Sequence, residues 1–272
     1  MRQGRVVFGG AVHGCTPTAD GRIRLADGRV LNETEVQWLA PFESRTIFAL
    51  ALNYADHATE LASKSSAEQA TFLKAQKAEP IVFLKGANSV VGHRGLTRRP
   101  REAEFMHYEC ELAVVIGREG RRISRADALQ YVGGYTVAND YAIRNFLEPY
   151  YRPNLRVKSR DGGTALGPWL VPAGEVADPM NLRLVTHLDG QLVQEGNTAD
   201  MIHDIPSLIE YLSNIMTLSP GDVILTGTPK GSVDVPVGQE VVCEVEGIGR
   251  LVNTLVQDWE PTRIFTPPRI PA

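Results

Sequence analysis

Residues 107–116, HYECELAVVI, combine an apolar strand with two acids. The apolar, β-branched second half of this segment predicts a buried strand. Glu109 and Glu111 stand two residues apart, and strand residues alternate between faces, so both carboxylates are expected on one face. Burying two like charges is costly unless a cation neutralises them. The pair alone fits either a divalent metal site or the wet face of a half-exposed strand.

A third acid, Asp140, follows the next predicted strand, residues 131–139. The last residue of a strand can turn toward ligands on a neighbouring strand. Three carboxylates with no Cys or His pattern nearby favour a hard ion, Mg²⁺ or Mn²⁺, that keeps open water positions. The sequence therefore suggests a metal site built from Glu109, Glu111 and Asp140.

His57 and Glu60 are spaced i, i+3 on a predicted short helix, so they share one of its faces. A carboxylate beside an imidazole can orient it and raise its basicity, which would give a base near neutral pH. The alternative is an ordinary pair on a helix surface. The polar residues 63–78 that follow are interpreted either as a lid that closes over a ligand or as a solvated surface helix.

A basic segment follows Asp140 and includes Arg144 and Lys158. In an acidic protein such a segment can attract an anionic substrate, although many such runs are solvated faces. Residues 226–229, TGTP, follow an apolar strand and are interpreted as a turn with two hydroxyl groups.

The predicted strands outnumber the helices, and their connections are mostly too short for βαβ crossovers. We therefore expect a β-rich α+β fold, a mixed roll or sandwich, with one clear amphipathic helix over residues 206–216. Residues 1–45 carry short β segments and Asp-Gly turns and are expected to form a small N-terminal β region. Residues 46–272 would form the catalytic domain.

Charge and apolar pattern exclude several partner classes. The 272 residues contain 28 Lys and Arg against 32 Asp and Glu, a net charge of −4, so no basic nucleic-acid surface is expected. The longest purely apolar run, residues 47–52, is far short of a membrane span, and no apolar block of a signal peptide begins the chain. Three scattered cysteines suit a reducing compartment, which predicts a cytoplasmic protein.

Six blocks together resemble the fumarylacetoacetate hydrolase superfamily over about residues 47–257. They are 53–60 (NYADHATE), 108–111 (YECE), 134–140 (GYTVAND), 158–159 (KS), 220–229 (PGDVILTGTP) and 246–249 (EGIG). The resemblance implies a mixed β-sandwich roll, a homodimer, and Mg²⁺ or Mn²⁺ held by the residues that match Glu109, Glu111 and Asp140.

The same resemblance implies the remaining site residues. His57 and Glu60 would form an acid/base dyad on a mobile lid, and Lys158 joins them in the catalytic group. Substrate binding is assigned to Arg144, Thr228 and Tyr54.

Residues 139–144 and 150–162 most resemble the isomerase/decarboxylase branch of the homoprotocatechuate pathway, which processes 5-oxopent-3-ene-1,2,5-tricarboxylate. The expected reaction is metal-dependent decarboxylation and isomerisation of a 2-oxo carboxylate in aromatic catabolism, through an enolate that the ion stabilises. Hydrolysis of an acylpyruvate, maleylpyruvate or fumarylpyruvate is the runner-up, and oxaloacetate decarboxylation is a third possibility. A metal-binding scaffold without catalysis is the non-enzymatic alternative. Residues 63–78 are longer than expected for the decarboxylase.

Overall fold

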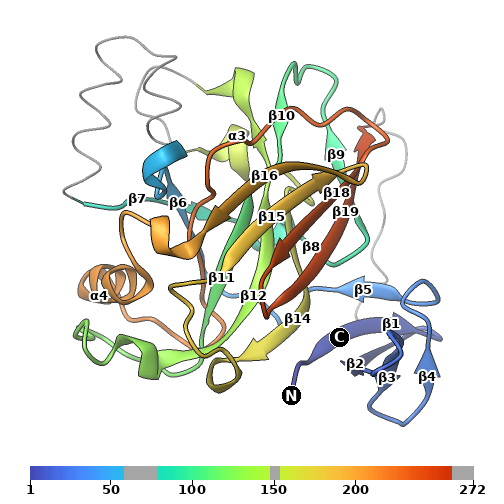
Figure 1. The fold of residues 1–272 in the computed structure, drawn as a ribbon, viewed down its shortest axis with the longest axis horizontal. Coiled ribbons are helices and arrows are strands. Elements are labelled where there is room, and N and C mark those ends of the chain that lie inside the picture. Colours follow the sequence, from blue (N-terminus) through green and yellow to red (C-terminus); the bar gives the residue numbers. More distant parts are fainter. Residues whose placement is uncertain (58–78, 148–153, 259–272) are drawn as a thin grey trace, which may run out of the picture.

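The structure is a computed structural model, and it describes residues 1–57, 79–147 and 154–258. The strands of these residues form four sheets, and short helices and loops join them (Figure 1). The described part of the chain contains no helix with the length and apolar character needed to cross a bilayer.

The N-terminal sheet has five antiparallel strands in the order β4-β3-β2-β1-β5. Its strands are β1 Gly4–Phe8, β2 Ala11–Pro17, β3 Ile23–Leu25, β4 Val30–Leu31 and β5 Gln37–Leu39. The Asp-Gly turns behave as predicted, because Gly21 and Gly28 take φ values of +80° and +92°, which favour glycine. The sheet has its own small core around Ile23, Leu25 and Trp38. Strands β2 and β5 were not predicted, and the domain boundary after residue 45 stays a prediction.

The largest sheet has seven strands in the order β7-β6-β17-β11-β12-β14-β8. Its strands are β6 Ile47–Ala51, β7 Ile81–Lys85, β8 Val90–Val91, β11 Cys110–Ile116, β12 Val132–Asp140, β14 Thr164–Pro172 and β17 Val223–Leu225. The pairs β17–β6 and β14–β8 are parallel and the other pairs are antiparallel. Every residue of β11 is buried, as its apolar sequence predicts.

A five-stranded sheet, in the order β16-β15-β18-β19-β9, packs against the largest sheet. Its strands are β9 Gly95–Arg99, β15 Arg183–Leu188, β16 Gln191–Asn197, β18 Glu240–Val245 and β19 Gly249–Gln257. Figure 1 shows β15, β16, β18 and β19 crossing in front of β11 and β12. Side chains of both sheets, including Leu112, Val137, Leu184 and Val241, share one core. The β-rich sandwich roll predicted from the sequence is confirmed.

The helices are short and lie at the margins of the sheets. Within the described residues, the α-helices with both ends placed are α3 Leu155–Lys158 and α4 Ile205–Ile215. The 3₁₀ turns are η1 Ala87–Ser89, η2 Ala128–Tyr131, η3 Arg144–Phe146, η4 Ala173–Glu175 and η5 Thr198–Asp200. Helix α4 matches the predicted helix within one residue at each end, and Asp204 caps it by accepting a hydrogen bond from the Ser207 N–H.

Candidate metal centre

Glu109, Glu111 and Asp140 meet in the interior of the molecule. One carboxylate oxygen from each lies within 4.8 Å of the others, and all three side chains are buried. Glu111 lies on β11 and Asp140 ends β12, and these strands pair in antiparallel register with Cys110 opposite Asn139. The register therefore brings the start of β11 to the end of β12, where the three carboxylates converge.

The local route to this arrangement differs from the predicted one. The segment predicted as one strand is interrupted: β10 (Met106–His107) pairs with β13 (Ala142–Ile143), and β11 begins only at Cys110. Glu109 lies in the break, where its backbone carbonyl accepts from the Asp140 N–H at 2.9 Å. The chain changes its partner strand at this point. The convergence of Glu109 and Glu111 therefore depends on this break as well as on strand alternation.

Three cationic side chains surround the acids. Lys158 donates to Glu109, to Asp140 Oδ2 at 2.9 Å and to the Asp140 carbonyl at 3.1 Å. Arg144 Nη2 donates to Glu109 Oε1 at 2.8 Å. Lys85 Nζ pairs with Asp140 Oδ1 and is fully buried. The basic residues predicted after Asp140 are therefore brought to the cluster.

Lys85 was missed in the sequence analysis. It ends β7, an edge strand of the largest sheet, and follows the apolar residues predicted as that strand. A lysine after an apolar run is a common way to end a strand, so its type alone gave no reason to single it out. Its partner Asp140 is 55 residues away, so no local signal in the sequence pointed to it.

The two glutamates have opposite electrostatic environments. Burial by itself would raise the pKa of Glu109, but Lys158 and Arg144 outweigh burial and lower this pKa to about 2. Burial, together with Asp140 and Glu109, raises the pKa of Glu111 well above its usual range. Glu109 is thus compensated within the protein, whereas Glu111 is not.

This difference shows that the acids fit a cation. Glu111 Oε2 accepts from the Gly227 N–H at 2.8 Å, but its other oxygen, Oε1, is buried and has no hydrogen-bond partner among the described residues. A buried carboxylate oxygen without a partner is costly. A divalent ion shared with Glu109 and Asp140 would satisfy it, and carboxylate oxygens are the donors that Mg²⁺ and Mn²⁺ take.

Other predicted residues lie around the cluster. The imidazole of His57 is buried, and its positive charge is one of the smaller effects that lower the pKa of Glu109. Tyr54 is fully buried, and its pKa is raised by burial and then by the charge of Glu111. Thr228 is buried in the turn after β17. Glu60 and the segment 63–78 lie outside the described residues, so the dyad and the lid stay predictions.

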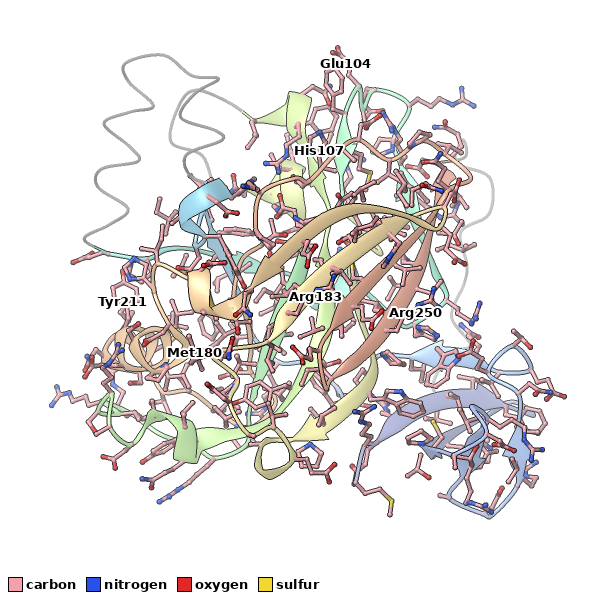
Figure 2. The ribbon with its side chains drawn as sticks, viewed as in Figure 1. Glu104, His107, Met180, Arg183, Tyr211 and Arg250 are labelled. Atoms are coloured by element: carbon pink, nitrogen blue, oxygen red, sulfur yellow. The ribbon has the colours of Figure 1, made fainter. Side chains whose placement is uncertain are left out.

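Two further polar residues extend the cluster and were missed in the sequence analysis. Arg144 Nη2 also donates to Ser232 Oγ at 3.2 Å, and that hydroxyl lies 3.4 Å from His107 Nδ1. Burial and the charge of Arg144 lower the pKa of His107 to about 4, so this imidazole is neutral at pH 7. Figure 2 labels His107 at the upper end of the sheets.

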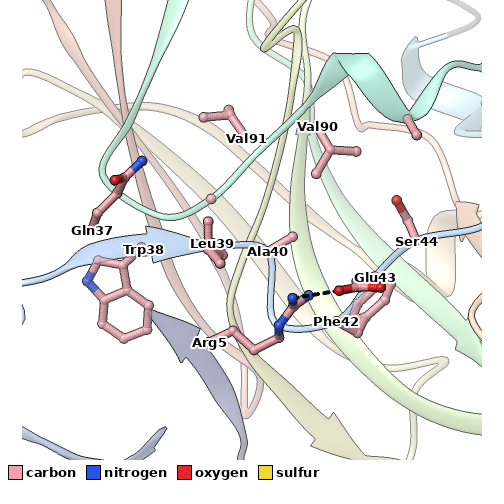
Figure 3. Close-up of a pocket in the computed structure, with 12 residues that line it drawn as sticks. Arg5, Gln37, Trp38, Leu39, Ala40, Phe42, Glu43, Ser44, Val90 and Val91 are labelled. Carbon is pink, nitrogen blue, oxygen red and sulfur yellow. Dashed lines mark hydrogen bonds and ion pairs between the residues drawn. The ribbon is translucent and has the colours of Figure 1, made fainter. Parts of the chain in front are cut away.

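A pocket of about 430 Å³ lies away from the acids, where the N-terminal sheet meets β8 (Figure 3). Arg5 and Glu43 form an ion pair of 2.9 Å at its wall. None of the predicted site residues lines this pocket, so it does not mark the candidate metal centre.

Comparisons with known proteins identify the family of this chain. A family model described as fumarylacetoacetate (FAA) hydrolase C-terminal matches residues 46–256. A 4-hydroxyphenylacetate degradation bifunctional isomerase/decarboxylase of Salmonella dublin is 57% identical over 211 residues, which are 78% of this chain and 47% of that protein. The chain thus spans about half the length of the first curated relatives that it matches.

Solved structures share the fold along most of the chain. A 5-carboxymethyl-2-hydroxymuconate delta-isomerase from Mycobacterium smegmatis has a TM-score of 0.79 and 34% identity, covering 96% of this chain and 100% of that one. A fumarylpyruvate hydrolase from Pseudomonas aeruginosa, solved in complex with Mn²⁺ and pyruvate, has a TM-score of 0.70 and 28% identity. That match covers 80% of this chain and 91% of the hydrolase.

Proposed function

Because this chain belongs to the fumarylacetoacetate hydrolase family, we propose that it is a Mg²⁺- or Mn²⁺-dependent decarboxylase and isomerase of a 2-oxo di- or tricarboxylate in aromatic catabolism. The substrate would be of the 5-oxopent-3-ene-1,2,5-tricarboxylate type. One observation carries the proposal: three buried carboxylates lie within 4.8 Å of one another, and one of their oxygens has no partner among the described residues. The names of the curated relatives support the reaction class.

Glu109, Glu111 and Asp140 would hold the ion. When bound, the ion would supply a Lewis acid for the carboxylate and keto oxygens of a 2-oxo acid. Lys85 and Lys158 both donate to Asp140, so they fix the position of this ligand. Lys158 also binds Glu109 and thereby ties two of the three ligands together.

Arg144 and Lys158 would hold the remote carboxylates of the substrate. Both side chains lie beside Glu109, and Arg144 also contacts Ser232. Charge-assisted hydrogen bonds of this kind are strong, and they would select which carbon–carbon bond aligns for cleavage. An anionic substrate would also balance the positive charge that the ion adds to the cluster.

His57 would move the proton. Its imidazole is buried and acts electrostatically on Glu109, and an imidazole can accept and release a proton near neutral pH. Loss of carbon dioxide leaves electron density on carbon that a proton must quench, and isomerisation moves a proton between carbons. His57, oriented by Glu60, would perform both transfers.

His57→Ala separates proton transfer from metal binding. Turnover should fall by about 10²–10⁴-fold, the usual contribution of a general acid or base, while Mg²⁺ affinity changes little. His13→Ala, a change of the same type in the N-terminal sheet, is the matched control and should leave turnover unchanged. Loss of Mg²⁺ binding in His57→Ala would contradict this division of roles.

Hydrolysis is the second candidate, and the solved fumarylpyruvate hydrolase with Mn²⁺ and pyruvate favours it. His57 would then activate a water that attacks a second carbonyl of the substrate. Product analysis separates the two reactions. The tricarboxylate, incubated with the protein and Mg²⁺, should release carbon dioxide, whereas fumarylpyruvate should stay intact. Formation of two acids from fumarylpyruvate, with no carbon dioxide from the tricarboxylate, would replace the first candidate with the second.

We further propose that the protein works in the cytoplasm as a homodimer on small anionic 2-oxo acids, without nucleic-acid or membrane partners. The acidic composition and the absence of a paired cysteine motif support this setting. Light scattering after size exclusion should give twice the chain mass of 29.8 kDa. A mass of one chain at micromolar concentration would contradict the dimer.

A further inference from the structure

Gln194 connects the five-stranded sheet with the turn that carries Thr228. It lies on β16, the edge strand of that sheet (Figure 1), and its side chain is buried. Its Nε2 donates to Thr228 Oγ1 at 3.0 Å and to the Pro229 carbonyl at 2.8 Å. Its Oε1 accepts from Thr186 Oγ1 at 2.9 Å. Both hydrogens of the Gln194 amide nitrogen are therefore donated in hydrogen bonds.

The partners fix which way the amide points. A backbone carbonyl only accepts, so the nitrogen of Gln194 must face the carbonyl of Pro229. The oxygen must then face Thr186, whose hydroxyl can donate. A flipped amide would put two acceptors against each other at Pro229, so the orientation is determined by chemistry.

This orientation determines the role of the Thr228 hydroxyl. Its oxygen accepts a hydrogen bond from Gln194, so its own hydrogen remains available to another acceptor. No described residue accepts that hydrogen bond from Thr228. The side chain is only 3% exposed, so bulk water is not a ready partner. A buried donor of this kind calls for an acceptor that arrives with a ligand.

The turn lies against the metal cluster. Gly227 precedes Thr228, and its N–H donates to Glu111 Oε2 at 2.8 Å. Gly227 takes a φ of +89°, which favours glycine. On the other side of the turn, a Cβ at Gly196 of β16 would lie 2.5 Å from Pro229 Cβ, so glycine at 196 allows the strand to approach this closely. The same turn thus donates a hydrogen bond to Glu111 on one side and accepts hydrogen bonds from Gln194 on the other.

We propose that Gln194 is a positioning residue that makes the Thr228 hydroxyl a hydrogen-bond donor to an acceptor oxygen of the bound 2-oxo acid. This inference rests on the proposed function, since it assumes that such an acid binds beside Glu111. It also adds a specificity rule: the position next to Thr228 accepts a carboxylate or keto oxygen and rejects a group that can only donate.

The test measures binding of pyruvate, the simplest 2-oxo acid, by titration calorimetry at saturating Mn²⁺. Thr228→Val removes the donor, and the pyruvate Kd should rise about tenfold, the effect of one hydrogen bond. Gln194→Glu leaves an acceptor-only group once the introduced carboxyl is ionised, so the measurement is made at a pH high enough to ionise it. The Thr228 hydroxyl then donates to this carboxylate instead, and the Kd should rise by a similar factor. The Mn²⁺ affinity should stay within about twofold in both variants.

The double variant distinguishes positioning from a general structural effect. If Gln194 acts through Thr228, then Gln194→Glu combined with Thr228→Val binds pyruvate as Thr228→Val alone does. Gln194→Leu, which removes the donor without adding charge, should raise the Kd by a smaller factor of about three and covers the case in which the Gln194→Glu variant does not fold. Gln257→Glu makes the same chemical change on β19 of the same sheet and should leave the Kd unchanged.

Two results would overturn the inference. One is an unchanged Kd for pyruvate in Gln194→Glu and Gln194→Leu. The other is a double variant whose rise in Kd equals the product of the rises in Gln194→Glu and Thr228→Val. If the unchanged protein binds Mn²⁺ but no pyruvate, the proposed function fails first, and this inference fails with it.

Discussion

The acidic cluster and a second buried region, where aromatic side chains meet, handle charge in opposite ways. In the cluster, Glu109 keeps its charge because Lys158 and Arg144 neutralise it. In this second region, which we call the aromatic seam and define as Trp38, His93 and Trp169, the imidazole of His93 is held neutral. The pKa of His93 is lowered to about 4, and burial is the largest cause.

The contacts of the seam explain this difference. Trp38 packs edge-on against both His93 and Trp169, with ring centroids 5.0 Å and 5.2 Å apart. The Val252 N–H donates to His93 Nδ1 at 3.1 Å, so that nitrogen carries no proton. An aromatic junction gains stability from apolar contact and leaves little room for charge. Buried charge is thus concentrated where the proposed chemistry needs it.

The largest expected effect is at the cluster. Glu109→Gln keeps the side-chain size but removes the charge between Lys158 and Arg144. Turnover should fall about a thousand-fold or more, since a catalytic metal supplies several kcal/mol of transition-state stabilisation. The rise in Tm on adding Mg²⁺ should disappear too, because ligand binding stabilises only the folded state that binds it.

Glu43→Gln is the matched control for this change. Glu43 forms an ion pair with Arg5 near the seam, and its side chain is largely exposed. Its replacement should change stability by less than about 0.5 kcal/mol. If Glu109→Gln kept both turnover and the Mg²⁺-dependent shift in Tm, the metal assignment would be wrong.

At the seam, Trp38→Ala should affect stability and leave chemistry intact. Trp38 is 4% exposed, and truncating a buried tryptophan costs about 3–5 kcal/mol. Urea unfolding measures this loss, while kcat under folding conditions should stay within about twofold of the unchanged protein. Val12→Ala, at an exposed position of β2, is the control and should change stability little. A large loss of Mg²⁺ affinity in Trp38→Ala would show that the two regions are coupled.

The two regions also differ in how far the sequence predicted them. The acids were accessible because carboxylates beside an apolar strand contradict its pattern, and the family blocks named the same residues. Lys85 was not accessible, because its partner Asp140 is 55 residues away and only the order of strands brings them together. The break before β11 was hidden for a similar reason, since it depends on pairing with β13.

The seam was not predicted at all. Trp38, His93 and Trp169 are far apart in sequence, and nothing local links them. Periodicity predicts elements, whereas contacts between distant elements follow from the fold.

Lys85→Met tests whether a buried cation stabilises the cluster before the ion binds. The change leaves Asp140 with fewer compensating charges, and removing one partner of a buried pair costs about 3–5 kcal/mol. We expect a loss of about 3 kcal/mol in the metal-free protein, at the lower end of that range, because Lys158 remains. Excess Mg²⁺ should restore part of it, so the Mg²⁺-dependent rise in Tm should exceed that of the unchanged protein. Lys230→Met, at an exposed position, is the control, and an equal rise in Tm in Lys85→Met would contradict the argument.

The smallest effect is a pH dependence that separates the two regions. The pKa of His93 is about 4 in the folded protein against 6.5 for a free imidazole, so the unfolded chain binds a proton more readily. The stability that His93 contributes is present above pH 6.5 and is lost as the pH falls toward 4, by roughly 2–3 kcal/mol. In the cluster, the pKa of about 2 for Glu109 causes a loss of stability only below about pH 4.5. The raised pKa of Glu111 acts in the opposite direction, because the stability that its protonated form contributes is lost as the pH rises above 4.5.

His93→Asn should flatten the upper part of this profile. The Asn amide oxygen can accept the Val252 N–H but does not titrate, so urea unfolding between pH 6.5 and 4 should show a shallower loss of stability. His107 also has a pKa of about 4 and keeps its share of the slope in this variant, so flattening should be partial. The loss below pH 4.5 should remain, since Glu109 is untouched. A slope above pH 4.5 identical to that of the unchanged protein would mean that the seam holds His93 neutral at no cost to stability.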